Sequence, residues 1–468
     1  MISKFSFLFA FLFLTISCNA DSGNNDSWNS SNNVNNSQEI CDNNIDDDGD
    51  GYLDCEDFEC VSYPGCSEQN NNNHNTQPKF TLTGKIMAPG SDDAQVLAEN
   101  RVPVYEALVA AYGYEPDPLP EGSYCNECVE VPQGVIHTFT EADGTFELEL
   151  YANKTYWITV QKGDFRRVTQ YTTGDDGQSE DFSTPVTQAS DHMVTLPNSH
   201  DPSHGAWIPK ILVIKGMYEE MEPMFSALGF AYGVEVKEVT DMDAEYIAAD
   251  INELRKYNLI ITTCGDDASY LNDSQIAANL KQYVEEGGKL YVDDFSYDWA
   301  EQPFPEFLSF YDGSTECGSG SSAPSTIGTC NHWSQYDPTG TPGDQKFEEW
   351  LNVINPNSSI DLLAAWDIIE TLNPGLQGDC SQDDDPDCVN GQFIKEPKVW
   401  MYGSWSGYTD NPVTVSWNYY CGKVLYTVYH THSGSSGGGY NYSLLLQEKI
   451  MLYLIMEIQT CTVTDIVE

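Results

Sequence analysis

The chain has 468 residues, with 20 lysines and arginines against 73 aspartates and glutamates, so its formal net charge is -53 at pH 7. A surface this acidic repels phosphate groups, which excludes nucleic-acid binding and direct docking on anionic lipid. Apolar residues make up 40% of the chain and aromatic residues 12%, which excludes a disordered acidic tail and predicts a multidomain protein with packed cores.

The first 18 residues predict export. Lys4 supplies a positive charge, residues 5–16 are almost purely apolar, and Ser17 precedes Cys18. The apolar run is too short to span a bilayer stably, which is typical of a signal peptide. The string ending at Cys18 resembles the lipobox of bacterial lipoproteins, with Thr15 in place of the favoured leucine. This resemblance implies that residues 1–18 are a lipoprotein signal peptide and that Cys18 is lipidated; an ordinary secreted protein is the alternative.

The residue after Cys18 favours one destination. In the familiar bacterial case an aspartate there favours inner-membrane retention, so Asn19 favours an outer-membrane lipoprotein that faces the periplasm or the cell surface. The lipid is then the contact with the membrane, because no second apolar stretch is long enough to span a bilayer. Residues 19–38 are rich in Asn, Ser and Asp and predict a disordered tether.

Residues 39–67 form a small Cys/Asp-rich module, and residues 68–78 are a second polar linker. In a loop that starts at Asp46, carboxylates occupy positions 1, 3, 5, 9 and 12, and a glycine occupies position 6. This is the oxygen-ligand spacing of a calcium loop. The sequence therefore predicts calcium as a structural cofactor. The expected ligands are Asp46, Asp48, Asp50, Tyr52, Asp54 and Asp57.

This loop ends in aspartate rather than glutamate, and cysteines rather than helices flank it. It therefore resembles thrombospondin type-3 or dockerin-like loops more than an EF-hand. A solvated acidic linker is the alternative. Two disulfides among the neighbouring cysteines would clamp the loop. These cysteines are Cys41, Cys55, Cys60 and Cys66.

Residues 79–198 predict an all-β domain. Phe80, Leu82 and Ile86 alternate with polar residues, as in a half-buried strand, and residues 145–150 alternate again after an Asp143-Gly144 hairpin signal. The string from 140 to 146, together with the earlier strand that contains Gly84, resembles the carboxypeptidase regulatory-like (transthyretin-like) β-sandwich. The resemblance implies a structural or adhesive spacer.

The remaining cysteines predict disulfides, as expected for an exported chain. Cys125 and Cys128 form a CxxC in a long loop. Because no second CxxC and no βαβ pattern accompany it, a disulfide that staples the loop is favoured over a redox or zinc site. Pairs are also expected within residues 317–330 and 380–388, the latter closing an acidic loop. Two of the isolated cysteines are expected to pair and leave one thiol. These are Cys264, Cys421 and Cys461.

Residues 199–209 predict a short polar hinge, after which residues 210–468 alternate strands and helices. Continuous apolar runs predict strands covered on both faces at 210–216, 258–265 and 289–294, with a late strand pair at 412–416 and 423–429. Helices are expected over 218–228 and 444–458. A further helix is expected around Ile276, Leu280 and Val284, because their spacing puts these apolar residues on one helical face. The alternation predicts a doubly wound, mostly parallel, flavodoxin-like α/β domain.

This strand order resembles the class I glutamine amidotransferase-like fold. In that family a cysteine nucleophile follows the strand equivalent to residues 289–292, in a Gly-x-Cys-x-Gly elbow, and a histidine ends the late strand with an acidic residue two places on. Here the elbow contains Asp293 and Asp294, and His430 is followed by Thr431 and His432. Two of the three triad members are therefore missing, so an enzymatic role does not follow from the resemblance.

Ligands bind at the carboxyl ends of strands in open α/β sheets, and Cys264 ends a neighbouring strand there. Cys264, Asp293, Asp294, His430 and His432 are expected to meet at that edge. The favoured function is a non-catalytic binding or structural module for a surface polysaccharide or a protein. The alternative is a hydrolase or amidase that uses Cys264, Asp294 and His430, although nearby carboxylates raise the pKa of a thiol. A metal site formed by His430, His432, Asp293 and Asp294 is a third hypothesis.

Aromatic residues within 298–305 suit either sugar stacking or loop packing, and packing is favoured.

Overall fold

The computed structural model describes residues 78–125, 131–132, 134–182, 194–265, 268–311, 328–329, 334–379, 388–389, 392–431 and 441–460, which belong to one compact unit, Asn75–Glu468. The predicted lipidation at Cys18, the tether and the calcium loop lie outside the described residues, as do His432 and Cys461. No helix of the described residues combines the length and the apolar character that crossing a membrane requires.

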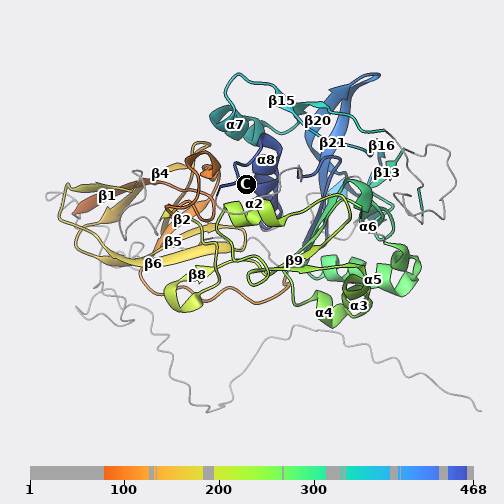
Figure 1. Ribbon diagram of the computed structural model, residues 1–468. Coiled ribbons are helices and arrows are strands. Elements are labelled where there is room, and N and C mark those ends of the chain that lie inside the picture. The colour runs from red at the N-terminus through yellow and green to blue at the C-terminus, as the bar shows by residue number, and fades with distance from the viewer. Residues whose placement is uncertain are drawn as a thin grey trace, which may run out of the picture. The chain divides into compact units, whose positions relative to one another are not determined.

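The first part of this unit is β-rich and contains two sheets (Figure 1). The three-stranded sheet has the order β4-β1-β7, with β4 at Thr145–Tyr151, β1 at Lys79–Lys85 and β7 at Ser179–Asp181. The five-stranded sheet has the order β3-β2-β5-β6-β8, with β3 at Ile136–Phe139, β2 at Leu108–Tyr112, β5 at Thr155–Lys162, β6 at Phe165–Thr172 and β8 at Ala206–Trp207. In β1 every second residue is buried, as the alternation predicted.

The predicted hairpin at Asp143 and Gly144 is wrong, although the turn exists. Gly144 has φ +82°, and the Asp143 carboxylate accepts a 3.0 Å hydrogen bond from the Thr145 amide. However, β3 and β4 belong to different sheets, and β4 pairs with β1. The Gly144 carbonyl accepts a 2.7 Å bond from the Ile86 amide, so the turn passes the chain from one sheet to the other beside the end of β1.

The predicted hinge at 199–209 contains an ordered strand. β8 pairs antiparallel with β6, and the buried ring of Trp207 lies 4.3 Å from the guanidinium carbon of Arg166. This segment therefore completes the five-stranded sheet and is part of the β-rich region, where a polar hinge was expected.

The second part is built on a nine-stranded sheet with the order β10-β9-β11-β12-β22-β21-β20-β14-β15. Its parallel half contains β10 (Val236–Val239), β9 (Ile211–Ile214), β11 (Leu259–Thr262), β12 (Lys289–Asp293) and β22 (Gly422–Thr427). Its antiparallel half contains β21 (Tyr408–Tyr419), β20 (Lys398–Trp405), β14 (Thr339–Pro342) and β15 (Ile360–Asp361). The expectation of a mostly parallel sheet is thus correct only for the half formed by β10, β9, β11, β12 and β22.

Helices flank the large sheet, and every residue of β9, β11 and β12 is buried. The helices are α2 (Glu222–Ala227), α3 (Asp241–Ala249), α4 (Ile251–Leu254), α5 (Ser274–Glu285), α6 (Asp298–Glu301), α7 (Gln345–Ile354) and α8 (Leu446–Ile458). α5 and α8 both contact β22, and they lie on opposite sides of the strands in Figure 1. Ile276, Leu280 and Val284 form the buried face of α5, as their spacing predicted.

Two small sheets complete the described structure. One joins β13 (Leu308–Phe310) to β16 (Ile369–Leu372), and the other has the order β17-β19-β18, with β17 at Leu376–Asp379, β19 at Gln392–Lys395 and β18 at Cys388–Val389.

The predicted disulfide between Cys125 and Cys128 is wrong, because Cys125 is bonded to Cys421, at a sequence separation of 296 residues. Cys421 lies in the turn between β21 and β22. Gly287 makes the approach possible: a Cβ there would lie 1.9 Å from the Tyr124 carbonyl oxygen, so only glycine lets the loop before Cys125 reach this turn.

Candidate functional site

The candidate site lies where the parallel strands β9, β11, β12 and β22 reach their carboxyl ends. Cys264 follows β11, Asp294 follows β12 and His430 follows β22. Because these strands are neighbours in the sheet, their ends bring the three side chains together. One ligand-type atom from each of the three side chains lies within 4.8 Å of the others. The sequence placed these three residues at this edge, and the structure brings them together there.

Asp294 lies at the tip of a tight strand-to-helix turn. Its φ is +41°, in the left-handed region that residues other than glycine rarely adopt, although aspartate tolerates it better than most. The Ser296 hydroxyl donates a 2.6 Å hydrogen bond to the Thr263 carbonyl and fixes this turn against the end of β11. The position of the family's elbow therefore has a tight turn with a carboxylate at its tip, although the cysteine and glycines of the elbow motif are absent, as the sequence showed.

The Asp294 carboxylate is engaged by three partners. Oδ1 accepts a 2.9 Å hydrogen bond from the Asp367 amide. Oδ2 lies 3.2 Å from Nδ1 of His430 and 3.6 Å from the Cys264 thiol, which donates to it. The exposed fractions are 0% for Cys264 and Asp294 and 6% for His430. These side chains are closed off from solvent.

Glu219 and Asp367 belong to the site although the sequence analysis did not single them out. Glu219 accepts a 3.2 Å bond from the Cys264 amide and a 2.6 Å bond from the Thr431 amide, and so ties the end of β11 to the segment after β22. Asp367 accepts a 2.5 Å bond from the Tyr426 hydroxyl. Glu219 follows β9, so the strand-end argument would have found it. Asp367 lies in an irregular segment before β16, where no pattern marks it.

The electrostatics keep the thiol protonated. Burial raises the pKa of Cys264 well above its ordinary value, and the charges of Asp294 and Asp293 add to this. Burial lowers the pKa of His430, but the hydrogen bond and charge of Asp294 outweigh it, so the net shift is upward. Burial also raises the pKa of the Asp294 carboxyl, against the hydrogen bond from His430. The site therefore favours a protonated thiol rather than a thiolate nucleophile.

Asp293 is fully buried beside these groups. Burial and the neighbouring Glu219 raise the pKa of its carboxyl well above the ordinary value. Neither carboxyl oxygen of Asp293 has a hydrogen-bond partner among the described residues.

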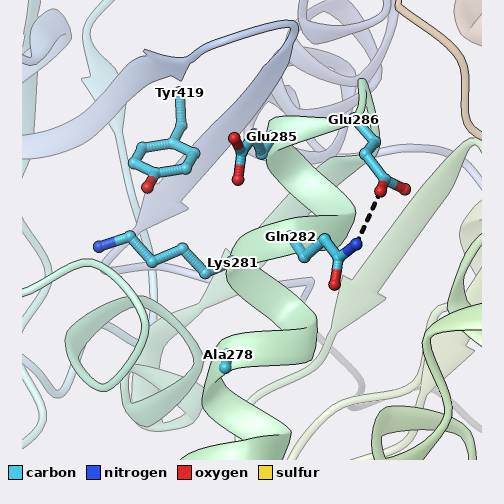
Figure 2. A pocket seen from close by; sticks show the side chains of 6 residues that line it. All are labelled: Ala278, Lys281, Gln282, Glu285, Glu286 and Tyr419. Atoms are coloured by element: carbon cyan, nitrogen blue, oxygen red, sulfur yellow. Dashed lines mark hydrogen bonds between the residues drawn. The ribbon is translucent and has the colours of Figure 1, made fainter. Parts of the chain in front are cut away.

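A surface depression of about 370 Å³ lies elsewhere, on α5 and β21 (Figure 2). Several of its polar side chains are paired: Lys281 donates to Glu306 at 2.8 Å, and Gln282 donates to Glu286 at 2.8 Å. The rings of Trp299 and Phe304 are fully buried, so they belong to the core and offer no sugar-stacking surface.

No protein-family model matches the chain, and no curated protein matches it. Several solved structures are similar to about half of it. A cytoplasmic protein from Salmonella typhimurium has 14% identity and a TM-score of 0.31 over 53% of this chain and 98% of its own. A ThuA-like protein from Parabacteroides merdae has 14% identity and a TM-score of 0.32 over 55% and 92%. A β-galactosidase from Bacillus circulans has 10% identity and a TM-score of 0.26 over 53% and 30%. At these values the function has to be argued from the residues of the site itself.

Proposed function

We propose that this chain is a lipid-anchored cell-envelope protein, exported to the outer membrane, whose α/β part is a binding or structural module and not a cysteine hydrolase. Cys18 would carry the lipid, and the loop from Asp46 to Asp57 would hold a structural calcium ion. The observation that carries the non-catalytic assignment is Asp294 at the tip of the elbow, with His430 paired to its carboxylate.

A nucleophilic cysteine needs a thiolate, a base within reach and access for substrate. Cys264 is fully buried, and its thiol donates to Asp294. The His430 Nδ1 atom pairs with the same carboxylate. His430 therefore contacts the Asp294 carboxylate through the imidazole nitrogen that would otherwise activate a nucleophile.

Thiol labelling tests this assignment. In the oxidised native chain, we expect iodoacetamide to modify Cys264 roughly 100-fold or more slowly than in the chain unfolded without reductant, because reaction requires local opening. Mass spectrometry of the peptide containing Cys264 gives the rate. The unfolded chain is the control for reactivity.

The hydrolase alternative rests on one observation, the convergence of Cys264, Asp294 and His430. It predicts fast labelling of native Cys264 that the His430→Ala substitution slows. That result would overturn the non-catalytic assignment and justify substrate screening.

Membrane fractionation tests the lipid anchor. We expect the Cys18→Ser variant to leave the membrane fraction of a bacterial host, because one acyl-modified cysteine is the predicted anchor. Immunoblotting of soluble and membrane fractions measures the change. Ser27→Ala, in the same tether, should stay in the membrane fraction. Retention of Cys18→Ser in the membranes would contradict lipidation as the anchor.

A further inference from the structure

The three buried side chains at the strand ends belong to the three residue types that bind zinc most often. Sγ of Cys264 lies 3.6 Å from Oδ2 of Asp294, and Nδ1 of His430 lies 3.2 Å from the same oxygen. Tetrahedral zinc with bonds of about 2.3 Å to sulfur and about 2.0 Å to nitrogen and oxygen places sulfur and oxygen about 3.5 Å apart, and nitrogen and oxygen about 3.3 Å apart. The observed spacings match both values.

The surroundings of these groups are rich in carboxylates. Four carboxyl groups are buried in this region, with exposed fractions of 2% for Glu219 and 0% for the others, which are Asp293, Asp294 and Asp367. Among the described residues, His430 is the only basic side chain that forms an ion pair with any of them. Buried carboxylates are costly unless they are paired, protonated or bound to a cation.

Asp293 is a further buried carboxyl beside this cluster, with Glu219 and Thr427 as its polar neighbours. Its side chain is fully buried, and neither oxygen has a hydrogen-bond partner among the described residues. It immediately precedes Asp294 at the end of β12.

We propose that Cys264, Asp294 and His430 bind a divalent transition-metal ion of the zinc class. A thiolate and an imidazole select zinc or cobalt over calcium and magnesium, which prefer oxygen ligands alone. Such an ion binds the thiolate and the neutral imidazole, so protons leave as the ion enters. The turn at Asp294 and the hydrogen bonds that Glu219 accepts from the Cys264 and Thr431 amides hold the ligands in place before the ion arrives. This inference does not depend on the lipid anchor or on the assignment as a non-hydrolase.

Cobalt titration tests the site directly. The purified full chain, with its disulfides intact, is titrated with Co²⁺ in a buffer that contains calcium to occupy carboxylate sites elsewhere. We expect one equivalent of Co²⁺ to produce a sulfur-to-cobalt charge-transfer band in the near ultraviolet, and Zn²⁺ to abolish it by displacement. Because the band requires a thiolate ligand, ion binding by other carboxylates of this acidic chain does not produce it.

Variants locate the ligands. Cys264→Ser should abolish the band, and Asp294→Asn and His430→Ala should weaken Co²⁺ binding by at least roughly tenfold. Asp164→Asn is the matched control: Asp164 is also a buried carboxylate, hydrogen-bonded to Tyr124 at 2.7 Å, and this variant should keep the band. Circular dichroism melting confirms that each variant is folded.

Either of two results would overturn the proposal. One is Co²⁺ binding to the wild-type chain without a charge-transfer band. The other is a band that persists in folded Cys264→Ser, which would assign the thiolate to another cysteine. The spectrum of the wild-type chain shows whether a sulfur atom binds the ion, even if a variant fails to fold.

Discussion

The double variant Cys125→Ser/Cys421→Ser is expected to lose about 2–5 kcal/mol of its free energy of unfolding, towards the upper end of this range. The bond joins residues separated by 296 positions, and a cross-link that closes so long a loop removes much conformational freedom from the unfolded chain. Denaturant unfolding followed by tryptophan fluorescence gives the free energy. The denaturant m-value should rise as well, because the unfolded chain becomes more expanded and exposes more surface.

Reduction of the wild-type chain is not an adequate substitute, because it opens every disulfide at once. The single variant Cys125→Ser is the better control, since it breaks the same cross-link and should lose a similar free energy. A loss below about 0.5 kcal/mol in both variants, typical of ordinary surface substitutions, would contradict a structural role for this bond.

The second large effect is expected at Trp350 on α7. Its fully buried ring lies 4.5 Å from the ring of Tyr453, and its Nε1 donates a 2.9 Å hydrogen bond to the Pro103 carbonyl in the β-rich part. Trp350→Ala should lower the free energy of unfolding by about 3–5 kcal/mol, because it leaves a large cavity and an unpaired carbonyl. The same denaturant unfolding measures it.

Phenylalanine variants separate the hydrogen bond from the packing. Trp350→Phe keeps an aromatic ring but removes the donor. Trp405→Phe is the matched control, because the buried Nε1 of Trp405 has no hydrogen-bond partner among the described residues, while its ring stacks on Tyr336 at 4.3 Å. Trp350→Phe should cost about 1–2 kcal/mol more than Trp405→Phe. Equal losses would show that the bond to Pro103 contributes nothing measurable.

The parallel strands and the meeting of Cys264 with Asp294 and His430 were predictable because they follow from local pattern. A strand covered on both faces must be apolar throughout, which identified β11 and β12, and parallel strands necessarily end at one edge. The buried state of the site was not predictable. It depends on Glu219 and Asp367, which reach the cluster through side-chain and backbone hydrogen bonds that leave no periodic signal.

The antiparallel half of the large sheet shows a second limit of sequence patterns. β20 contains Gly403, and its register against β21 shifts at several places, so no clean alternation marks it. The partner of Cys125 was equally hidden. Loop closure across 296 residues depends on the whole fold, and on the close approach that Gly287 allows.

The bond between Cys125 and Cys421 also determines how the chain responds to mechanical tension. A pull applied before residue 125 and after residue 421 passes through the two sulfur atoms, so the 296-residue stretch between them carries no load. Unbridged, that stretch would extend to roughly 1000 Å at about 3.3–3.6 Å per residue. Cys264 and Asp294 lie inside the shielded stretch, whereas His430 lies beyond it. Beyond Cys421, the elements of the described residues are β22 and α8, which are free to peel away, so force would withdraw His430 while the contact between Cys264 and Asp294 persists.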